Sequence, residues 1–329
     1  CGKRSGSKLA ASALLAVGTF LGVVSGGVEA ATLTCTTSAA DNTGNIVCGS
    51  GATANTGQSI AIGGSSNAIG DQSVAVGANT NATGNSSIAI GGDDLDKVAS
   101  TSPPAYNVNA PNTNNNTAAA TKYKTLTGDD LVNFADVTKR YVSTQAGNGA
   151  VAIGVQAVAT GELGTAFGTK AKALGVASVG LGVGANASLE NAVALGAGAT
   201  TVTNATAVTS ASVGTGASAL TYANFGGANV SSGDQVSVGS VGYERQIKNV
   251  APGAVSTSST DAINGSQLYS VAVTLQDKLT RYYSVKSSNT AAGSNYANDG
   301  ATGTDSMAAG VSAVAAGASA VAVGTGANA

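Results

Sequence analysis

The chain has no histidine and no tryptophan, and aromatic and charged residues make up only 4% and 10% of its 329 residues. About a quarter of the residues in an ordinary globular domain are charged, so this composition does not suit one large core. The missing histidine excludes a Ser-His-Asp triad, histidine acid–base catalysis and an HExxH zinc site. No glycine-rich run has the pattern of a phosphate-binding loop. We therefore expect no enzyme and no cofactor.

Charge of either sign is also sparse. The formal net charge is −2, and no basic stretch is interleaved with aromatic residues, so we expect no nucleic-acid partner. The densest acidic cluster, Asp93-Asp94-Leu95-Asp96, is either a cation site or a solvated turn. It lacks the twelve-residue spacing of an EF-hand, which favours the turn and no metal.

Glycine, by contrast, is abundant, with 46 residues that do not fall at every third position, which excludes collagen. Many of these glycines end a block that recurs every fourteen residues. Ser59-Ile60-Ala61-Ile62-Gly63 returns at 73–77 and 87–91, resumes after an interruption at 150–154, 164–168, 178–182 and 192–196, and starts again at 306–310 and 320–324, with a spacing of fourteen residues within each run. A fixed period of this kind marks a solenoid, in which each repeat is one coil.

Each block divides into two halves of seven residues, and each half has room for one short strand and a turn. The second half of the first block contains Asn67-Ala68-Ile69-Gly70. Two short strands per coil, stacked about 4.8 Å from the next coil, make a narrow parallel β-roll. The predicted fold class is therefore all-β.

The two-residue period of a strand assigns the faces of the roll. We expect Ile60 and Ile62 to point inward against Ala68, and Ala61 to point outward. The corresponding outward row is Ala61, Ala75, Ala89, Ala152, Ala166, Gly180 and Ala194. Small residues permit close approach of another backbone, so this row is predicted to be the packing face between copies in an oligomer. The alternative is an alanine-rich surface on a monomeric solenoid.

The first residues predict export. Residues 1–30 have a basic start and an apolar stretch, and Val28-Glu29-Ala30 fits cleavage between Ala30 and Ala31 by the Sec pathway. The chain begins at Cys1 rather than at methionine, so we expect part of the leader to be missing. In an oxidising compartment, Cys35 and Cys48 are expected to form a disulfide that staples the first coil. The alternative is a pair of small buried thiols.

The repeat is interrupted in two places. Between Asp93 and Asn148, Pro103-Pro104 and Pro111 indicate an irregular loop, with a short helix expected over 129–141 and its N-cap at Asp129 or Gly128. A second helix is expected after an N-cap at Asp261. Its apolar stripe, spaced for a coiled coil, is Ile263, Leu268, Val271, Leu275, Leu279 and Tyr282. A single helix docked on the roll is the alternative.

These motifs together resemble the trimeric autotransporter adhesins with YadA-like heads. The fourteen-residue blocks are similar to the head repeats, Tyr222–Gly227 to the FGG insertion, and Gly91–Leu131 to the head insert. Val236–Gly239, Glu244–Gly253 and Asp261–Leu268 resemble the neck. The expected organisation is a signal peptide (1–30), head roll (31–92), head insert (93–149), head roll (150–205), FGG-type insertion and connector (206–240), neck (241–268), short coiled-coil stalk (269–290) and the start of a second head roll (291–329).

The resemblance implies a homotrimer of left-handed β-rolls on the surface of a Gram-negative bacterium. It implies adhesion to host extracellular matrix, to host cells or to other surfaces. The family's membrane anchor is a twelve-stranded barrel assembled from three chains; this chain has no such segment, and we expect it to be an N-terminal fragment attached to the outer membrane only through that anchor.

We expect adhesion to come from repeated weak contacts that trimeric display multiplies. The candidate ligand surface is Asn67, Asn81, Lys172 and Asn186 on the outward second strands, with Tyr106 and Tyr123 in the insert. The alternative function is a monomeric β-solenoid that binds ice, carbohydrate or calcium. Ice binding needs flat threonine rows and a calcium roll needs Gly-Gly-x-Gly-x-Asp repeats, and this sequence has neither.

Overall fold

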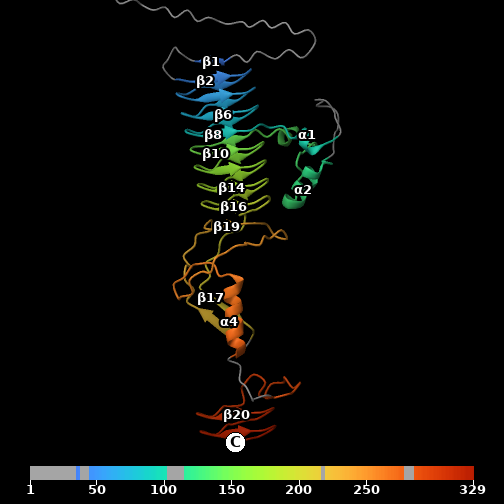
Figure 1. Ribbon diagram of the computed structural model, residues 1–329, viewed down its shortest axis with the longest axis vertical. Coiled ribbons are helices and arrows are strands. Elements are labelled where there is room, and N and C mark those ends of the chain that lie inside the picture. The colour runs from blue at the N-terminus through green and yellow to red at the C-terminus, as the bar shows by residue number, and fades with distance from the viewer. Residues whose placement is uncertain (1–34, 38–43, 102–114, 216–218, 278–284) are drawn as a thin grey trace, which may run out of the picture.

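The computed structural model describes residues 35–37, 44–101, 115–215, 219–277 and 285–329. The chain forms a long stack of coils, then an open segment with one helix, then a second short stack at the C-terminal end (Figure 1). Short helices lie beside the first stack (Figure 1). Within the described residues, no helix is long and apolar enough to span a bilayer.

The first strands of successive coils form a ten-stranded sheet, here called sheet A. Its strands in order are β1 (Cys35–Thr37), β2 (Ile46–Cys48), β4 (Ile60–Ile62), β6 (Val74–Val76), β8 (Ile88–Ile90), β10 (Val151–Ile153), β12 (Thr165–Phe167), β14 (Val179–Leu181), β16 (Val193–Leu195) and β19 (Val236–Ser237). Every neighbouring pair is parallel except β1 and β2. Between β2 and β8, partners are fourteen residues apart.

The second strands form a seven-stranded parallel sheet, sheet B. Its strands are β3 (Thr53–Ala54), β5 (Asn67–Ala68), β7 (Asn81–Ala82), β9 (Gln145–Ala146), β11 (Val158–Ala159), β13 (Lys172–Ala173) and β15 (Asn186–Ala187). Two parallel sheets with one strand each per coil are the predicted β-roll, and the all-β fold class is confirmed.

The interior of the roll is filled by alanine, contrary to the predicted faces. Ala61 and Ala75 from sheet A and Ala68 and Ala82 from sheet B are all fully buried in one chain. The predicted outward packing row is therefore wrong: it points into the roll, where Ala61, Ala75, Ala89, Ala152, Ala166 and Ala194 have no exposed surface. The sheets face each other across so short a distance that no side chain larger than a methyl group fits between two such strands. The branched residues on either side consequently point outward.

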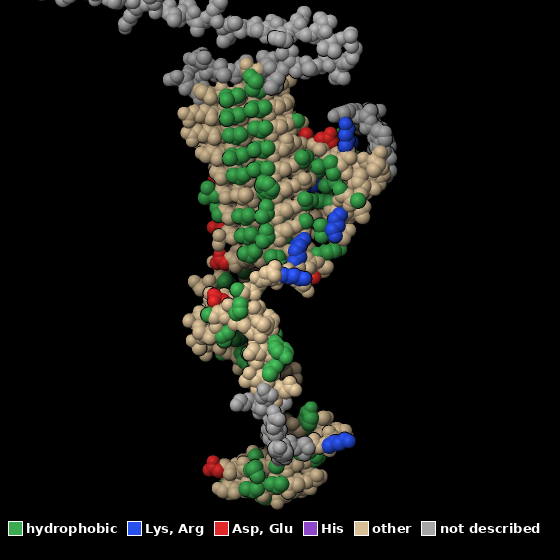
Figure 2. All heavy atoms as spheres, in the orientation of Figure 1, with side chains coloured by type: hydrophobic (Ala, Val, Ile, Leu, Met, Phe, Trp, Pro, Cys, Tyr) green, Lys and Arg blue, Asp and Glu red, His purple; other side chains and the backbone are tan. Residues whose placement is uncertain are grey.

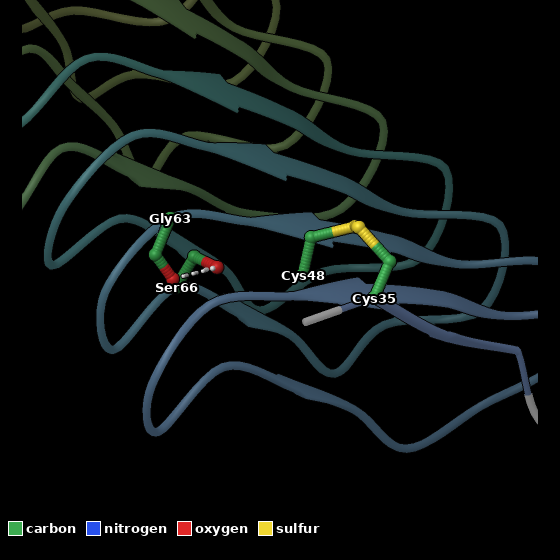
Figure 3. Close-up of a disulfide and its surroundings, with 4 residues drawn as sticks. All are labelled: Cys35, Cys48, Gly63 and Ser66. Atoms are coloured by element: carbon green, nitrogen blue, oxygen red, sulfur yellow. Dashed lines mark hydrogen bonds between the residues drawn. A yellow bond between two sulfur atoms is a disulfide. The ribbon is translucent and has the colours of Figure 1, made fainter. Parts of the chain in front are cut away.

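Buried hydroxyls accompany these alanines at the turns. Ser66 Oγ donates to the carbonyl oxygen of Gly63 at 3.0 Å (Figure 3). Thr80 repeats the bond to Gly77 at 3.1 Å one coil later. Gly63 has φ +128°, and a Cβ at this position would lie 2.4 Å from the carbonyl oxygen of Gly77. Glycine is therefore required both for the left-handed backbone and for the close stacking of coils.

The N-terminal end of the roll is closed by β1. This strand pairs antiparallel with β2 and places Cys35 opposite Cys48, and the two are joined by a disulfide with an S–S distance of 2.09 Å (Figure 3). The structure thus contains the predicted pairing. An added strand covers the backbone edge that the first coil would otherwise expose to other chains.

The insert is a small lobe with its own core. It contains α1 (Asp96–Ala99), α2 (Ala118–Thr127) and α3 (Val137–Arg140). Its buried residues are Leu95, Ala99, Ala120, Tyr123, Leu131 and Val132. Of the helix expected over 129–141, only α3 is helical, and its N-cap is Asp136. The predicted N-cap at Asp129 or Gly128 is wrong, because Gly128 adopts φ +81° and caps the C-terminus of α2.

The segment after the first roll is extended and open. β17 (Ser210–Val213) and β18 (Leu220–Ala223) form a hairpin, and α4 spans Gly265–Asp277. The predicted N-cap Asp261 is wrong: its carboxylate accepts from the backbone of Ala254, and Asn264 Oδ1 instead accepts from the backbone N–H of Gln267. Leu279 and Tyr282 of the expected stripe lie outside the described residues. β20 (Met307–Ala309) and β21 (Val321–Val323) begin the second roll.

Candidate functional site

Sheet A presents a continuous apolar stripe to its outer side. The stripe, visible in Figure 2, consists of the outward side chains of strands β4 to β16, two per strand. It begins with Ile60 and Ile62 of β4, and Thr165 is its one polar member. Several are strongly exposed, with Phe167 at 51% and Leu195 at 42% of their surface accessible. Seven strands about 4.8 Å apart give the stripe a length of about 29 Å. A contiguous apolar surface of this kind marks an interaction site.

Apolar side chains are also exposed in the segment that follows the first roll. Both strands of the β17–β18 hairpin are exposed along their whole length. On α4, Leu268 and Leu275 are 67% and 64% accessible, and Val271 between them is also exposed. A helix of thirteen residues with an exposed apolar face is marginal in water on its own, which indicates that α4 packs against another surface.

The predicted ligand residues on sheet B do face outward. Asn67 Nδ2 donates to Asn81 Oδ1 at 2.9 Å, and Thr53 Oγ1 donates to Asn67 Oδ1 at 2.6 Å, so these side chains form a ladder along the roll. Lys172 is exposed, and Asn186 is half-buried next to it in sheet B. Their role in ligand binding remains a prediction.

The two tyrosines of the predicted surface have different outcomes. The prediction that Tyr123 is an exposed contact residue is wrong, because this side chain lies in the core of the insert with 7% of its surface accessible. Burial, reinforced by the negative charge of Asp129, raises the pKa of Tyr123 to about 12. Tyr106 lies outside the described residues, as do Ala30 and Ala31 of the expected cleavage site.

The acidic cluster at the start of the insert is a structural turn. Asp94 Oδ1 caps the backbone N–H of Asp96, and Asp93 Oδ2 accepts from Asn79. Asp96 Oδ2 lies 2.5 Å from Arg140 Nη2, and the hydrogen bond to Asp96 raises the pKa of Arg140. No group of three or more acidic or cysteine residues could hold a metal ion in the described parts of the chain.

A groove runs between the insert and sheet B. It comprises two adjoining cavities of about 640 and 530 Å³, which share Tyr123, Asp129, Lys170 and Lys172. Lys172 and Asn186 of sheet B form its floor, and the C-terminal end of α2 forms one wall. Sequence reasoning found Lys172 and Asn186 but not the groove, because the interruption of the repeat gives no sign of where the insert docks.

The groove is also lined by a column of turn residues fourteen apart, Gln156, Lys170, Gly184 and Gly198, and the C-terminal end of α2 packs directly on its two glycines. A Cβ on Gly184 would lie 2.7 Å from Thr127 Cγ2, and one on Gly198 would lie 2.6 Å from the carbonyl oxygen of Leu126. Helix α2 can therefore approach the roll only where this column changes to glycine. That change from Gln and Lys to Gly at one repeat position is the signal that could have located the docked helix.

Family models match five segments of the roll and the segment around α4. The model described as the YadA head domain repeat matches residues 68–93, 146–171, 159–179, 173–199 and 301–327. The model described as the coiled stalk of trimeric autotransporter adhesin matches residues 246–291. No curated protein sequence matches the chain.

Two solved structures are similar to parts of the chain. The C-terminal YadA-like domain of a Burkholderia pseudomallei protein is 27% identical, with 55% of this chain and 70% of that domain covered and a TM-score of 0.26. The collagen-binding domain of the Yersinia adhesin YadA is 22% identical, with 68% of this chain and 87% of that domain covered and a TM-score of 0.35.

Proposed function

Because the chain belongs to the trimeric autotransporter adhesins with YadA-like heads, we propose that it is the adhesive part of a surface-anchored homotrimer. Its role is attachment and not catalysis: three heads side by side present their outer faces to extracellular matrix, to host cells or to another surface. The outward residues of sheet B and the insert are the surfaces available for such contacts. Export and attachment to the outer membrane of a Gram-negative bacterium belong to the same proposal.

The observation that carries the trimer is the apolar stripe of sheet A. Burying branched aliphatic side chains stabilises an assembly by about 25 cal/mol for each Å² of apolar surface removed from water. Three copies arranged around an axis along the roll would bring three stripes together and leave sheet B and the insert facing outward. The exposed apolar residues of α4 fit the same assembly, because a coiled coil buries one helix face against its neighbours.

The test is the molar mass of the chain in solution, measured by light scattering. The unmodified chain is expected to have three times the 31.2 kDa mass of one chain. Ile153→Lys, on β10, places a charge in the middle of the stripe that the trimer would bury, at a cost of several kcal/mol, and should give monomers. Asn81→Lys adds the same charge on sheet B and should leave the trimer intact.

A monomeric mass for the unmodified chain would contradict the proposal and favour the monomeric solenoid. Equal loss of assembly in both lysine variants would show that the stripe is not the interface. Circular dichroism of each variant would establish that the roll itself is still folded.

A further inference from the structure

The groove between the insert and sheet B contains two lysines without a charge partner. Lys170 and Lys172 both line its two cavities. Neither has a carboxylate within 4.0 Å among the described residues, whereas Lys124 and Lys139 beside them are paired with Asp130 and Asp136. Asp129 also lines both cavities and partly offsets these charges, but the lining as a whole holds four lysines against Asp129 and Asp130. The groove therefore has a local excess of positive charge although the chain as a whole is acidic.

The protein holds these two charges close together at an energetic cost. Burial, and then the positive charge of Lys172, lower the pKa of Lys170, while the negative charge of Asp129 acts in the opposite direction. The ammonium of Lys170 lies 5.6 Å from the centre of the Tyr123 ring. Like charges near one another in a partly dry site are unfavourable unless an anion lies between them. Such an arrangement is typical of a site that binds a negatively charged group.

The groove also contains hydrogen-bond acceptors that have no donor. Gln156 is 3% exposed, and its Nε2 donates to the carbonyl oxygens of Asp93 and Arg140 at 2.6 and 2.7 Å. These two bonds fix the orientation of the amide, so that Oε1 is an acceptor, and it has no partner. Asn186 Oδ1, on the floor, is buried without a partner as well. A ligand hydroxyl within reach of either oxygen would supply the missing donor.

The shape of the groove favours an extended ligand. Its floor from Val158 to Thr200 spans three coil intervals, which is about 14 Å at the spacing of neighbouring strands. Its floor is the face of a sheet and not an edge, so a peptide could not bind there by adding a strand. The lining offers no exposed row of aromatic rings on which nucleic-acid bases could stack.

We propose that this groove binds an acidic polysaccharide, with Lys170 and Lys172 contacting its carboxylate or sulfate groups and Gln156 and Asn186 accepting from its hydroxyls. The proposal deepens the adhesive role proposed above by naming a ligand class, and it rests on that role for its biological meaning. The site is complete within one chain, and a trimer would present three copies of it.

The experiment is calorimetric titration of the full chain with oligosaccharides of defined charge. The probes are a heparin-derived hexasaccharide for sulfate, a hyaluronan-derived hexasaccharide for carboxylate, and a neutral dextran hexasaccharide. At least one acidic probe should bind, with an affinity that falls as salt increases, and the neutral probe should not. A poly-glutamate peptide of similar length tests the acidic-peptide alternative.

Variants then locate the site. Lys170→Gln and Lys172→Gln should each weaken binding about tenfold, since each removes a charge-assisted hydrogen bond. Lys172→Arg should retain most of the affinity. The matched control is Lys122→Gln, an exposed lysine of α2 that does not line the groove, and it should change affinity less than about twofold.

Three results would overturn the proposal: unchanged affinity in the double variant Lys170→Gln with Lys172→Gln, equal binding of the neutral probe, or a preference for poly-glutamate. Light scattering on the same samples separates this inference from the proposed trimer. If the protein is a trimer that binds no acidic probe, only the proposed ligand of the groove is contradicted. If it is a monomer that binds an acidic probe, only the proposed trimer is contradicted.

Discussion

At the scale of single residues, the alanines of the roll are a steric requirement. Ala75 is fully buried. Ala61 and Ala89 lie beside it on the neighbouring strands of sheet A, and the alanines of sheet B face it across the interior. The next residue, Val76, points out into the apolar stripe. The same short strand thus has one position where size is limited by the interior and one where it is not.

We expect Ala75→Val to lower the free energy of unfolding by about 1–3 kcal/mol, because two added carbons overpack an interior with no space for them. Val76→Ile is the matched control, since it enlarges the neighbouring outward residue, and it should change stability by less than about 0.5 kcal/mol. Urea denaturation followed by circular dichroism measures both. A more stable Ala75→Val variant would mean that the interior contains unfilled space.

At the same scale, the prediction of which strand face is buried was wrong. The two-residue period showed that Ala61 and Ile60 lie on opposite faces, but period alone does not say which face is inside. Larger residues are usually buried, and that general rule favoured Ile60. The contrary evidence was in the columns themselves: from β4 to β16 the alanine column holds only Ala and Gly, whereas one flanking column includes Thr165 and the other includes Phe167. A position that tolerates such variation is not enclosed by its own roll.

At the scale of elements, the insert interrupts the chain but not the roll. Strand β8 pairs directly with β10, and β7 with β9, with Asn81 opposite Gln145. The backbone N–H of Asn81 donates to the carbonyl oxygen of Thr144, as that of Asn67 donates to Thr80 one coil earlier. Thr144 therefore takes the place that Thr80 has in an uninterrupted coil.

It follows that residues 94–143 can be removed without breaking the repeat. Joining Asp93 to Thr144 leaves Asn81 and Gln145 the same fourteen residues apart as Asn67 and Asn81 in the preceding coil. We expect the deletion variant to fold with a melting temperature within about 5 °C of the unmodified chain. Differential scanning calorimetry measures this. Loss of the folded roll would show that the insert supports the coils beneath it.

The existence of these elements was largely predictable, and their local boundaries were not. A period of fourteen with glycine at each turn specified the strands of both sheets and their register. The insert has no period, so its helices depended on local signals, and Gly128 was interpreted as a start when it is the end of α2. Similarly, Asp261 and Asn264 are both good capping residues, and only the tertiary contact of Asp261 with Ala254 decides between them.

At the scale of the whole molecule, each coil contacts only its immediate neighbours, as in any solenoid. Stability then depends on the ends, where a coil has one neighbour instead of two. The N-terminal end is covered by β1, and the disulfide between Cys35 and Cys48 holds it there.

We expect Cys35→Ser to increase amide hydrogen exchange in residues 44–54 and to leave residues 150–195 unchanged. A disulfide closing a short loop contributes about 2–3 kcal/mol on the chain-entropy model, and in a solenoid this contribution is local. Amide hydrogen exchange measured by mass spectrometry tests whether the effect is confined to the N-terminal coils. Faster exchange along the whole roll would show instead that the coils unfold as one unit.

The direction of the hydrogen bonds in the two sheets has a mechanical consequence. They run along the long axis of the stack, from coil to coil, as the order of strands from β2 to β16 shows (Figure 1). When one end is held and the other is pulled, tension passes through every coil interface in series, and at each interface several backbone bonds share the load. The interface with the fewest bonds yields first, and the others stay closed. An attached head under flow would therefore lengthen one coil at a time while its remaining coils keep their shape.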